Sequence, residues 1–126
     1  MHQSPVRSFK DLLVWQEAMI LAEITYRLVA LLPNSERYEL SSQMRRASVS
    51  IPSNIAEGYA RESRGSYLQF LRIARGSLRE LETQILLTVR LDLLDAASTV
   101  PALAKCDQVG RLLHGLIRSI DATGET

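Results

Sequence analysis

The stretch Arg45-Arg46-Ala47-Ser48-Val49-Ser50-Ile51-Pro52-Ser53-Asn54-Ile55-Ala56-Glu57-Gly58 decides how this chain folds. At 3.6 residues per turn, the apolar residues in and just before it fall on one face of a helix: Leu40, Met44, Ala47, Ile51, Ile55 and Gly58. This face stays in phase on both sides of Pro52. Proline costs about 3 kcal/mol in an ordinary helix interior, because it lacks an N–H and crowds the carbonyl group four residues earlier. The pattern therefore predicts one helix that bends at Pro52 rather than two helices.

The polar side chains of the same stretch form a second stripe beside Pro52, made of Arg46, Ser50, Ser53, Asn54 and Glu57. One interpretation is a carboxylate-bearing pocket that positions a phosphate or a base, with Glu80 and Glu82 facing it. The other, which we favour, is a hydrogen-bonded network that relieves the carbonyl group freed by Pro52 and fixes the register of the helices. No histidine or metal lies in the stretch to activate its serine and glutamate side chains. We therefore expect no catalytic residue here.

The composition indicates one domain, 1–126, that buries roughly two thirds of the surface its unfolded chain exposes. The net charge of +1 gives no general signal for nucleic-acid binding, so such binding would need a local basic patch. The sequence contains a single cysteine, Cys106, which excludes an internal disulfide and a cysteine-based zinc site within one chain.

Residues 12–32 are apolar enough to raise the question of a membrane span. Glu17, Glu23 and Arg27 lie inside this run, and a spanning helix would tolerate them badly. The amino-terminal residues also lack the apolar core and small-residue cleavage site of a secretory signal. We expect a soluble, cytoplasmic protein with no membrane partner.

The apolar periodicity predicts an all-α, antiparallel up-down-up-down four-helix bundle, with helices at about 9–32, 36–58, 64–92 and 99–121. Serine and threonine residues at the expected starts are predicted to cap these helices: Ser8, Ser35 or Ser41, Ser63, and Ser98 or Thr99. Asp11 is expected to complete a capping box with Ser8, and Pro101 to lie in the first turn of the last helix. Gly58 is expected to end the second helix in a left-handed conformation.

Three features predict that the bundle self-associates. Apolar residues nearly encircle the first helix, which indicates that something outside a four-helix bundle covers part of it. Val49 and Ala56 lie on the back of the second helix, either as scattered surface residues or as a seam for another helix. Gly76 lies in the middle of the third helix outside its apolar face, where glycine costs about 1 kcal/mol relative to alanine. A close backbone neighbour, which could belong to another subunit, would explain it.

Motifs that carry enzyme chemistry are missing from the sequence. Its only histidines are His2 and His114, and neither has the carboxylate spacing of a bundle that holds two metal ions. Cys106 lies on the apolar stripe of the last helix, which is typical of a core residue rather than a nucleophile. No nucleotide-binding loop or nucleophile elbow occurs. We expect no cofactor, no metal and no enzyme activity.

Arginines form one stripe along the predicted third helix: Arg64, Arg72, Arg75, Arg79 and Arg90. Arginine makes bidentate contacts with phosphate and with carboxylate alike. The stripe is thus either a surface that binds RNA or DNA, or a solvated face with ion pairs to Glu82 and to neighbouring subunits.

Four stretches carry a family resemblance: 9–16, 36–40, 43–58 and 74–84. They resemble the small bacterial four-helix-bundle proteins encoded in intervening sequences of the large ribosomal RNA. Glu39 departs from this pattern, where glycine is expected, so the entry to the second helix should differ locally. The resemblance implies an antiparallel bundle that forms ring-like pentamers. It also implies a fold similar to that of the accessory proteins of diversity-generating retroelements, which partner a reverse transcriptase and nucleic acid.

The leading expectation is a non-enzymatic, homo-oligomeric accessory or assembly protein that binds RNA or DNA through the arginine stripe. A reverse transcriptase is an expected partner by analogy of fold alone. The alternative is a protein–protein scaffold without nucleic acid, in which the arginines are used in subunit interfaces.

Overall fold

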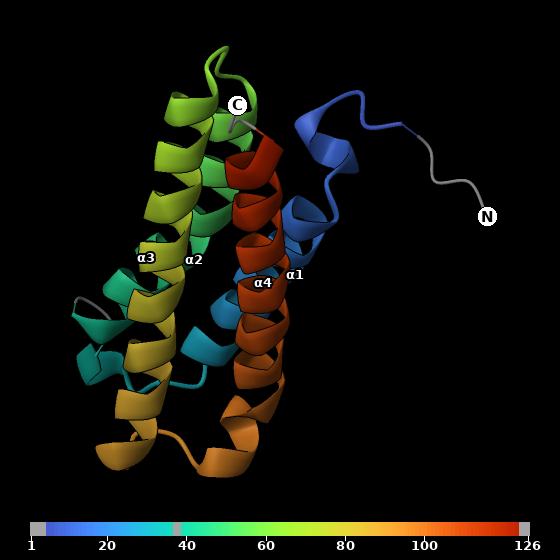
Figure 1. Ribbon diagram of the computed structural model, residues 1–126. Helices are drawn as coiled ribbons and strands as arrows, with labels where there is room; N and C mark the ends of the chain where they lie inside the picture. The colour runs from blue at the N-terminus through green and yellow to red at the C-terminus, as the bar shows by residue number, and fades with distance from the viewer. Residues whose placement is uncertain (1–4, 37–38, 124–126) are drawn as a thin grey trace.

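The computed structural model describes residues 5–36 and 39–123, and within them it contains four α-helices that pack side by side (Figure 1). These are α1 Leu13–Val29, α2 Leu40–Tyr59, α3 Arg64–Arg90 and α4 Ala96–Thr123. Each helix packs against the next along the chain, and α4 returns to α1. The all-α antiparallel four-helix bundle expected from the sequence is therefore present. No helix in the described ranges combines the length and the apolar character needed to cross a membrane.

The first helix is shorter than the predicted 9–32. Ser8 and Asp11 do form the expected capping box, but it caps the single 3-10 turn η1, Phe9–Asp11. Leu12 is extended, with ψ 123°, and separates this turn from α1. The turn stays close to the helix because the rings of Phe9 and Trp15 pack in a T-shaped arrangement, with their centroids 5.2 Å apart. At the other end α1 stops at Val29, because the following amides bond in the tighter 3-10 manner.

Helix α2 runs without a break through Pro52, which confirms the prediction of a single helix. It begins at Leu40 rather than near residue 36, because the 3-10 turn η2, Asn34–Glu36, comes before it. Glu39 holds the cap position with φ −102° and ψ −89° and makes no capping bond through its side chain, so neither Ser35 nor Ser41 caps this helix. The remaining residues of this entry, 37–38, lie outside the described ranges.

The predicted left-handed end of α2 at Gly58 is wrong. The helix continues to Tyr59, and no glycine in the described ranges has a positive φ. Gly58 is instead buried against α3. A Cβ atom placed there would lie 2.9 Å from Cβ of Phe70 and 3.1 Å from Cδ1 of Tyr67. Close approach of two helices, rather than backbone conformation, explains this glycine.

The ends of α3 are well defined. Ser63 caps its start as predicted, since its hydroxyl accepts a bond from the Ser66 amide at 3.1 Å. After Arg90, Asp92 adopts a left-handed φ of 58°, and the Leu93 amide donates to the carbonyl oxygen of Thr88 at 2.9 Å. This is a Schellman motif with aspartate at the position that glycine usually occupies.

Helix α4 starts three residues earlier than predicted. The carboxylate of Asp95 accepts bonds from the amide and the hydroxyl of Ser98, at 2.8 and 2.6 Å. Asp95 is therefore the cap, and Ser98 and Thr99 lie inside the helix. These bonds from Ser98 lower the pKa of the Asp95 carboxyl. Pro101 consequently lies in the second turn of α4 rather than in the first.

The core is aliphatic and receives side chains from all four helices, among them Leu21, Ile51, Leu78 and Val109. Cys106 of α4 belongs to it and is fully buried. The pKa of its thiol is raised to about 12, mainly by burial and also by the nearby carboxylate of Glu82, while the guanidinium of Arg79 opposes the change.

Replacing Gly58 by alanine should lower the free energy of unfolding by about 1–3 kcal/mol, because the new methyl group overlaps the rigid Cβ of Phe70. Gly115 of α4 is a matched control, since nothing lies within 4 Å of a Cβ atom placed there. Gly115→Ala should stabilise the protein by up to about 1 kcal/mol. Urea unfolding followed by circular dichroism measures both. Equal effects of the two substitutions would contradict the close approach of α2 and α3.

The Cys106 thiol should resist alkylation by iodoacetamide at about pH 8 in the folded protein and react readily in guanidinium chloride. The unfolded thiol ionises near a pKa of about 8.5, whereas the folded thiol stays protonated. Because the pKa is raised in the folded state, the buried thiol makes its full contribution to the free energy of unfolding below about pH 8.5. This contribution is lost as the pH rises toward about 12. Mass spectrometry measures the labelling, with Cys106→Ala as the baseline. Equal labelling of the folded and unfolded chains would contradict a buried thiol.

Candidate nucleic-acid interface

The five arginines of the predicted stripe all lie on α3. Arg64, Arg72, Arg79 and Arg90 are exposed, and Arg75 is half-buried. The buried face of α3 includes Leu71, Ala74 and Leu78, and this orientation turns the arginine side toward solvent along the border with α4. The structure therefore places the stripe on an accessible surface of the single chain.

Two of these arginines make ion pairs. Arg64 meets Asp121 of α4 at 3.5 Å, and Arg79 meets Glu82 on its own helix at 3.2 Å. The Arg79 side chain is still 62% exposed, and exposed pairs of this kind contribute about 0–1 kcal/mol. Among the described residues, Arg72, Arg75 and Arg90 make no ion pair with a carboxylate. The ion pairs with neighbouring carboxylates therefore engage the arginines of the stripe only weakly.

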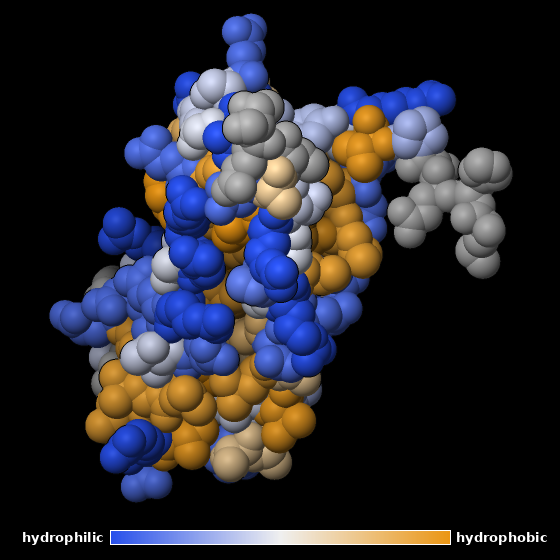
Figure 2. Space-filling model, viewed as in Figure 1, coloured by the Kyte–Doolittle hydropathy of each residue, from blue (hydrophilic) through white to orange (hydrophobic). Residues whose placement is uncertain are grey.

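Helix α4 adds basic residues that do not belong to the predicted stripe. Arg118 lies one turn before Asp121, and Arg111 follows Gly110, which packs beside Arg79. Both arginines are exposed, and Arg111 pairs with Asp107 at 2.6 Å. Figure 2 shows the result as two hydrophilic ridges along the upper parts of α3 and α4. The seven-residue spacing of Arg111 and Arg118 puts them on one helix face and could have revealed them.

The character of this surface changes toward the carboxyl end of α3. The exposed side chains there are apolar: Leu86, Leu87, Leu91 and Val100. We call this region, which consists of the connection between α3 and α4 with the helix turns on either side of it, the apolar corner (Figure 2). Arg90 lies in this region, apart from the other four arginines. The densest part of the basic stripe is therefore the stretch from Arg64 to Arg79, and Arg90 lies beyond it, beside the apolar corner.

The polar stripe of α2 separates into parts with different roles. The hydroxyls of Ser50 and Ser77 are 2.8 Å apart, which joins α2 to α3. The Asn54 side chain donates to the carbonyl oxygen and the hydroxyl of Ser50, at 2.8 and 2.9 Å. This network links the two helices as the favoured interpretation expected, but the carbonyl group it satisfies belongs to Ser50 and not to Ser48. The Ser48 hydroxyl donates to the carbonyl oxygen of Arg45 at 2.8 Å.

The remaining members of the stripe do not join this network. Ser53 is exposed, and Glu57 pairs with Arg61 at 3.2 Å. Glu82 lies on the α4 side of α3, near Arg79 and Cys106, so the idea that it faces the stripe is wrong. Glu80 does lie on the α2 side. The structure thus does not assemble the five polar residues into one pocket.

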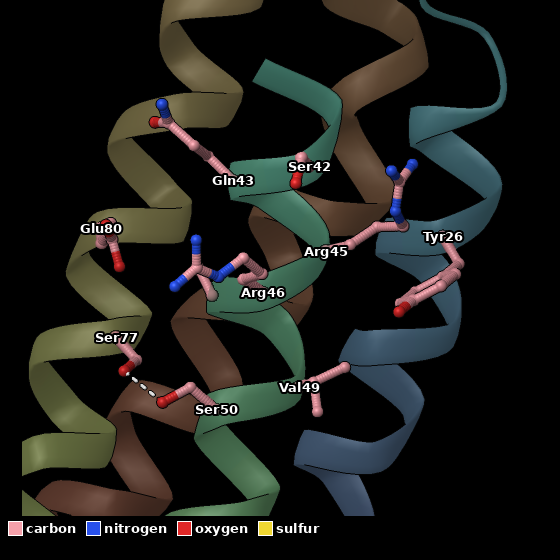
Figure 3. A pocket seen from close by; sticks show the side chains of 10 residues that line it. Tyr26, Ser42, Gln43, Arg45, Arg46, Val49, Ser50, Ser77 and Glu80 are labelled. Atoms are coloured by element: carbon pink, nitrogen blue, oxygen red, sulfur yellow. Dashed lines mark hydrogen bonds between the residues drawn. The ribbon is translucent and has the colours of Figure 1, made fainter. Parts of the chain in front are cut away.

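A groove of about 830 Å³ runs over the outer surface of α2, from Tyr26 on α1 to Ser77 and Glu80 on α3 (Figure 3). Its floor is lined by Ser42, Gln43, Arg45, Arg46, Val49 and Ser50. Figure 3 shows Arg45 extending toward Tyr26 and Arg46 toward Glu80. Val49 lies between them with 44% of its surface exposed. The groove offers cationic and apolar groups rather than an activated nucleophile.

The residues expected at a subunit interface remain accessible in the single chain. Val49 is exposed and Ala56 is half-buried, and on α1 both Met19 and Tyr26 are exposed, with Tyr26 lining the groove over α2. Among the described residues, Gly76 has no atom within 4 Å of a Cβ atom placed on it, so the neighbour proposed for it does not lie in the described part of this chain. Across the described ranges, no three His, Cys, Asp or Glu side chains gather closely enough to hold a metal ion.

Known proteins share this arrangement. A protein with unknown function from the S23 ribosomal protein family of Bacteroides thetaiotaomicron is 24% identical, with a TM-score of 0.77, and the match covers 83% of this chain and 98% of that one. At this identity the likeness shows the fold alone. No curated protein matches the chain. The family model of the 23S rRNA-intervening sequence protein matches residues 10–115. Because that match spans most of the sequence, the chain belongs to the 23S rRNA-intervening sequence protein family.

Proposed function

We propose that this protein is a non-enzymatic accessory protein that forms a ring-like homo-oligomer, with five subunits favoured, and binds RNA or DNA through α3. The observation that carries the proposal is the accessible group Arg72, Arg75 and Arg79, of which only Arg79 makes an ion pair with a carboxylate among the described residues. Arg111 and Arg118 of the neighbouring helix α4 are exposed as well. The proposed setting is the cytoplasm, with a reverse transcriptase as a partner by analogy of fold alone.

The physical basis is counterion release. Each arginine that neutralises a phosphate displaces condensed cations from the nucleic acid, and this term depends on salt but not on sequence. One subunit offers only a few such contacts, which gives weak binding. A ring repeats them, and the linked contacts bind with much greater avidity. The family name refers to 23S rRNA, so RNA is the nucleic acid to test first.

A scaffold without nucleic acid is the second candidate. It is favoured by the pairs Arg64–Asp121 and Arg79–Glu82, because arginines that already meet carboxylates within one chain can also meet those of a neighbouring subunit. The two candidate functions predict different outcomes when the arginines of α3 are replaced by glutamate.

Combining Arg72→Glu, Arg75→Glu and Arg79→Glu should weaken RNA binding at least roughly 10-fold while the helicity and the oligomer persist. Binding by the unchanged protein should fall steeply as salt rises from about 50 to about 200 mM. Fluorescence anisotropy with single-stranded and double-stranded RNA of unrelated sequences measures both effects.

The matched control carries the same change of charge on exposed residues away from α3, as Arg7→Glu, Lys10→Glu and Arg27→Glu. Its affinity for RNA should fall much less than that of the α3 variant. Dissociation of the α3 variant into monomers would favour the scaffold. No binding by the unchanged protein at low salt would overturn the nucleic-acid proposal.

Gly76→Ala tests the subunit neighbour proposed for that residue. In an isolated chain the methyl group enters open space, and the helix gains up to about 1 kcal/mol. If another subunit packs there, the same methyl group should instead shift the oligomer toward monomers. Analytical ultracentrifugation over a dilution series measures the shift, and unchanged assembly would remove Gly76 from the interface.

A further inference from the structure

Rings of more than two identical subunits need two different surfaces on each copy, because a surface that pairs with itself gives only a two-fold dimer. The described part of the chain offers two apolar surfaces in different places. One is the apolar corner, in which Leu91 and Val100 are 55% and 60% exposed. The other is the groove over α2 with its apolar members Tyr26 and Val49.

The apolar corner is rigid and carries two aspartates, Asp92 and Asp95, next to Arg90. The Schellman motif at Asp92 fixes the end of α3, and the cap formed by Asp95 fixes the start of α4. Both aspartates are exposed beside Leu91 and Val100. A surface held in this way loses little conformational freedom when it docks.

The groove over α2 has the complementary properties. Arg45 and Arg46 project from its floor on either side of Val49, and Tyr26 forms one wall (Figure 3). Neither arginine makes an ion pair with a carboxylate in the described ranges. The groove is large enough to receive several side chains rather than one ion. Its apolar groups can pack on leucines while its guanidinium groups meet carboxylates.

We infer that subunits join head to tail, with the apolar corner of one copy seated in the groove over α2 of the next copy. Leu91 and Val100 pack on Tyr26 and Val49, and the acidic residues of the corner face the arginines of the groove. This inference rests on the assembly part of the proposed function. The contact uses the carboxyl end of α3, so the arginines from Arg64 to Arg79 stay free to bind nucleic acid.

Two variants, each altered in one surface, test the inference. The groove variant carries Arg46→Glu and Val49→Glu, and the corner variant carries Leu91→Glu and Val100→Glu. Size-exclusion chromatography with light scattering should find each variant alone as a monomer, with association at least roughly 10-fold weaker than in the unchanged protein. An equimolar mixture should form one-to-one dimers, because the intact corner of the first variant fits the intact groove of the second.

A control variant with Leu13→Glu and Ile20→Glu changes exposed apolar residues on the other side of α1 and should assemble normally. Circular dichroism verifies that every variant folds. Asp92→Asn is a milder probe, because asparagine tolerates the left-handed backbone while the charge is lost. It should weaken assembly and reduce its dependence on salt, and no change in either would contradict the charge pairing.

The outcomes separate this inference from the proposed function. A monomeric unchanged protein overturns the proposed assembly itself. An oligomer that persists in either variant overturns the head-to-tail contact and leaves the assembly proposal standing. If the two variants also stay monomeric when mixed, the head-to-tail contact is overturned, since the intact corner of one variant then does not bind the intact groove of the other. RNA binding that is lost in the groove variant while its assembly persists would assign Arg46 to nucleic acid instead.

Discussion

The close packing of α2 against α3 is the constraint on which the rest of the structure depends. Gly58 lets the helices approach so closely at one end that a single methyl group would meet Phe70 at 2.9 Å. Nearer the middle, the hydroxyls of Ser50 and Ser77 are 2.8 Å apart, which supports the rotation of α3 that its buried apolar face sets. With Ser77 turned toward α2, the arginines fall on the side next to α4. The internal packing of α3, together with this hydrogen bond, therefore determines where the external charge appears.

The bundle could be predicted because its periodicity is a property of each helix alone, and the phase across Pro52 was correct for that reason. Errors arose where a local signal had two explanations. Gly58 looked like a helix end, but only the neighbouring helix explains it. Asp95, Ser98 and Thr99 can all cap a helix, and only the actual hydrogen bond distinguishes them. Asp92 adopts a left-handed backbone conformation that usually requires glycine. The sequence therefore did not predict the Schellman motif that ends α3.

The candidate site was predictable in part for a similar reason. Spacing along one helix located the arginine stripe, but the contribution of Arg111 and Arg118 depends on how α4 lies beside α3. Glu80 and Glu82 are two residues apart and hence about 200° apart around a helix, so the two could not both face α2. That correction needed no structure. The division of the polar stripe between Ser50 and Glu57 did need one, because it follows from the position of Ser77.

Helix α3 carries two kinds of surface in sequence, first the arginines up to Arg79 and then the leucines of the apolar corner. A rigid helix fixes the distance between them, about 1.5 Å for each residue. If the corner makes the subunit contact, the arginines of successive copies are spaced by the geometry of that contact. If the protein also binds nucleic acid as proposed, its affinity for a long nucleic acid depends on assembly even though no residue serves both purposes, because avidity requires several arginine groups on one particle. Protein concentration would thus control nucleic-acid binding, because it sets how many subunits are joined through the leucines of the apolar corner.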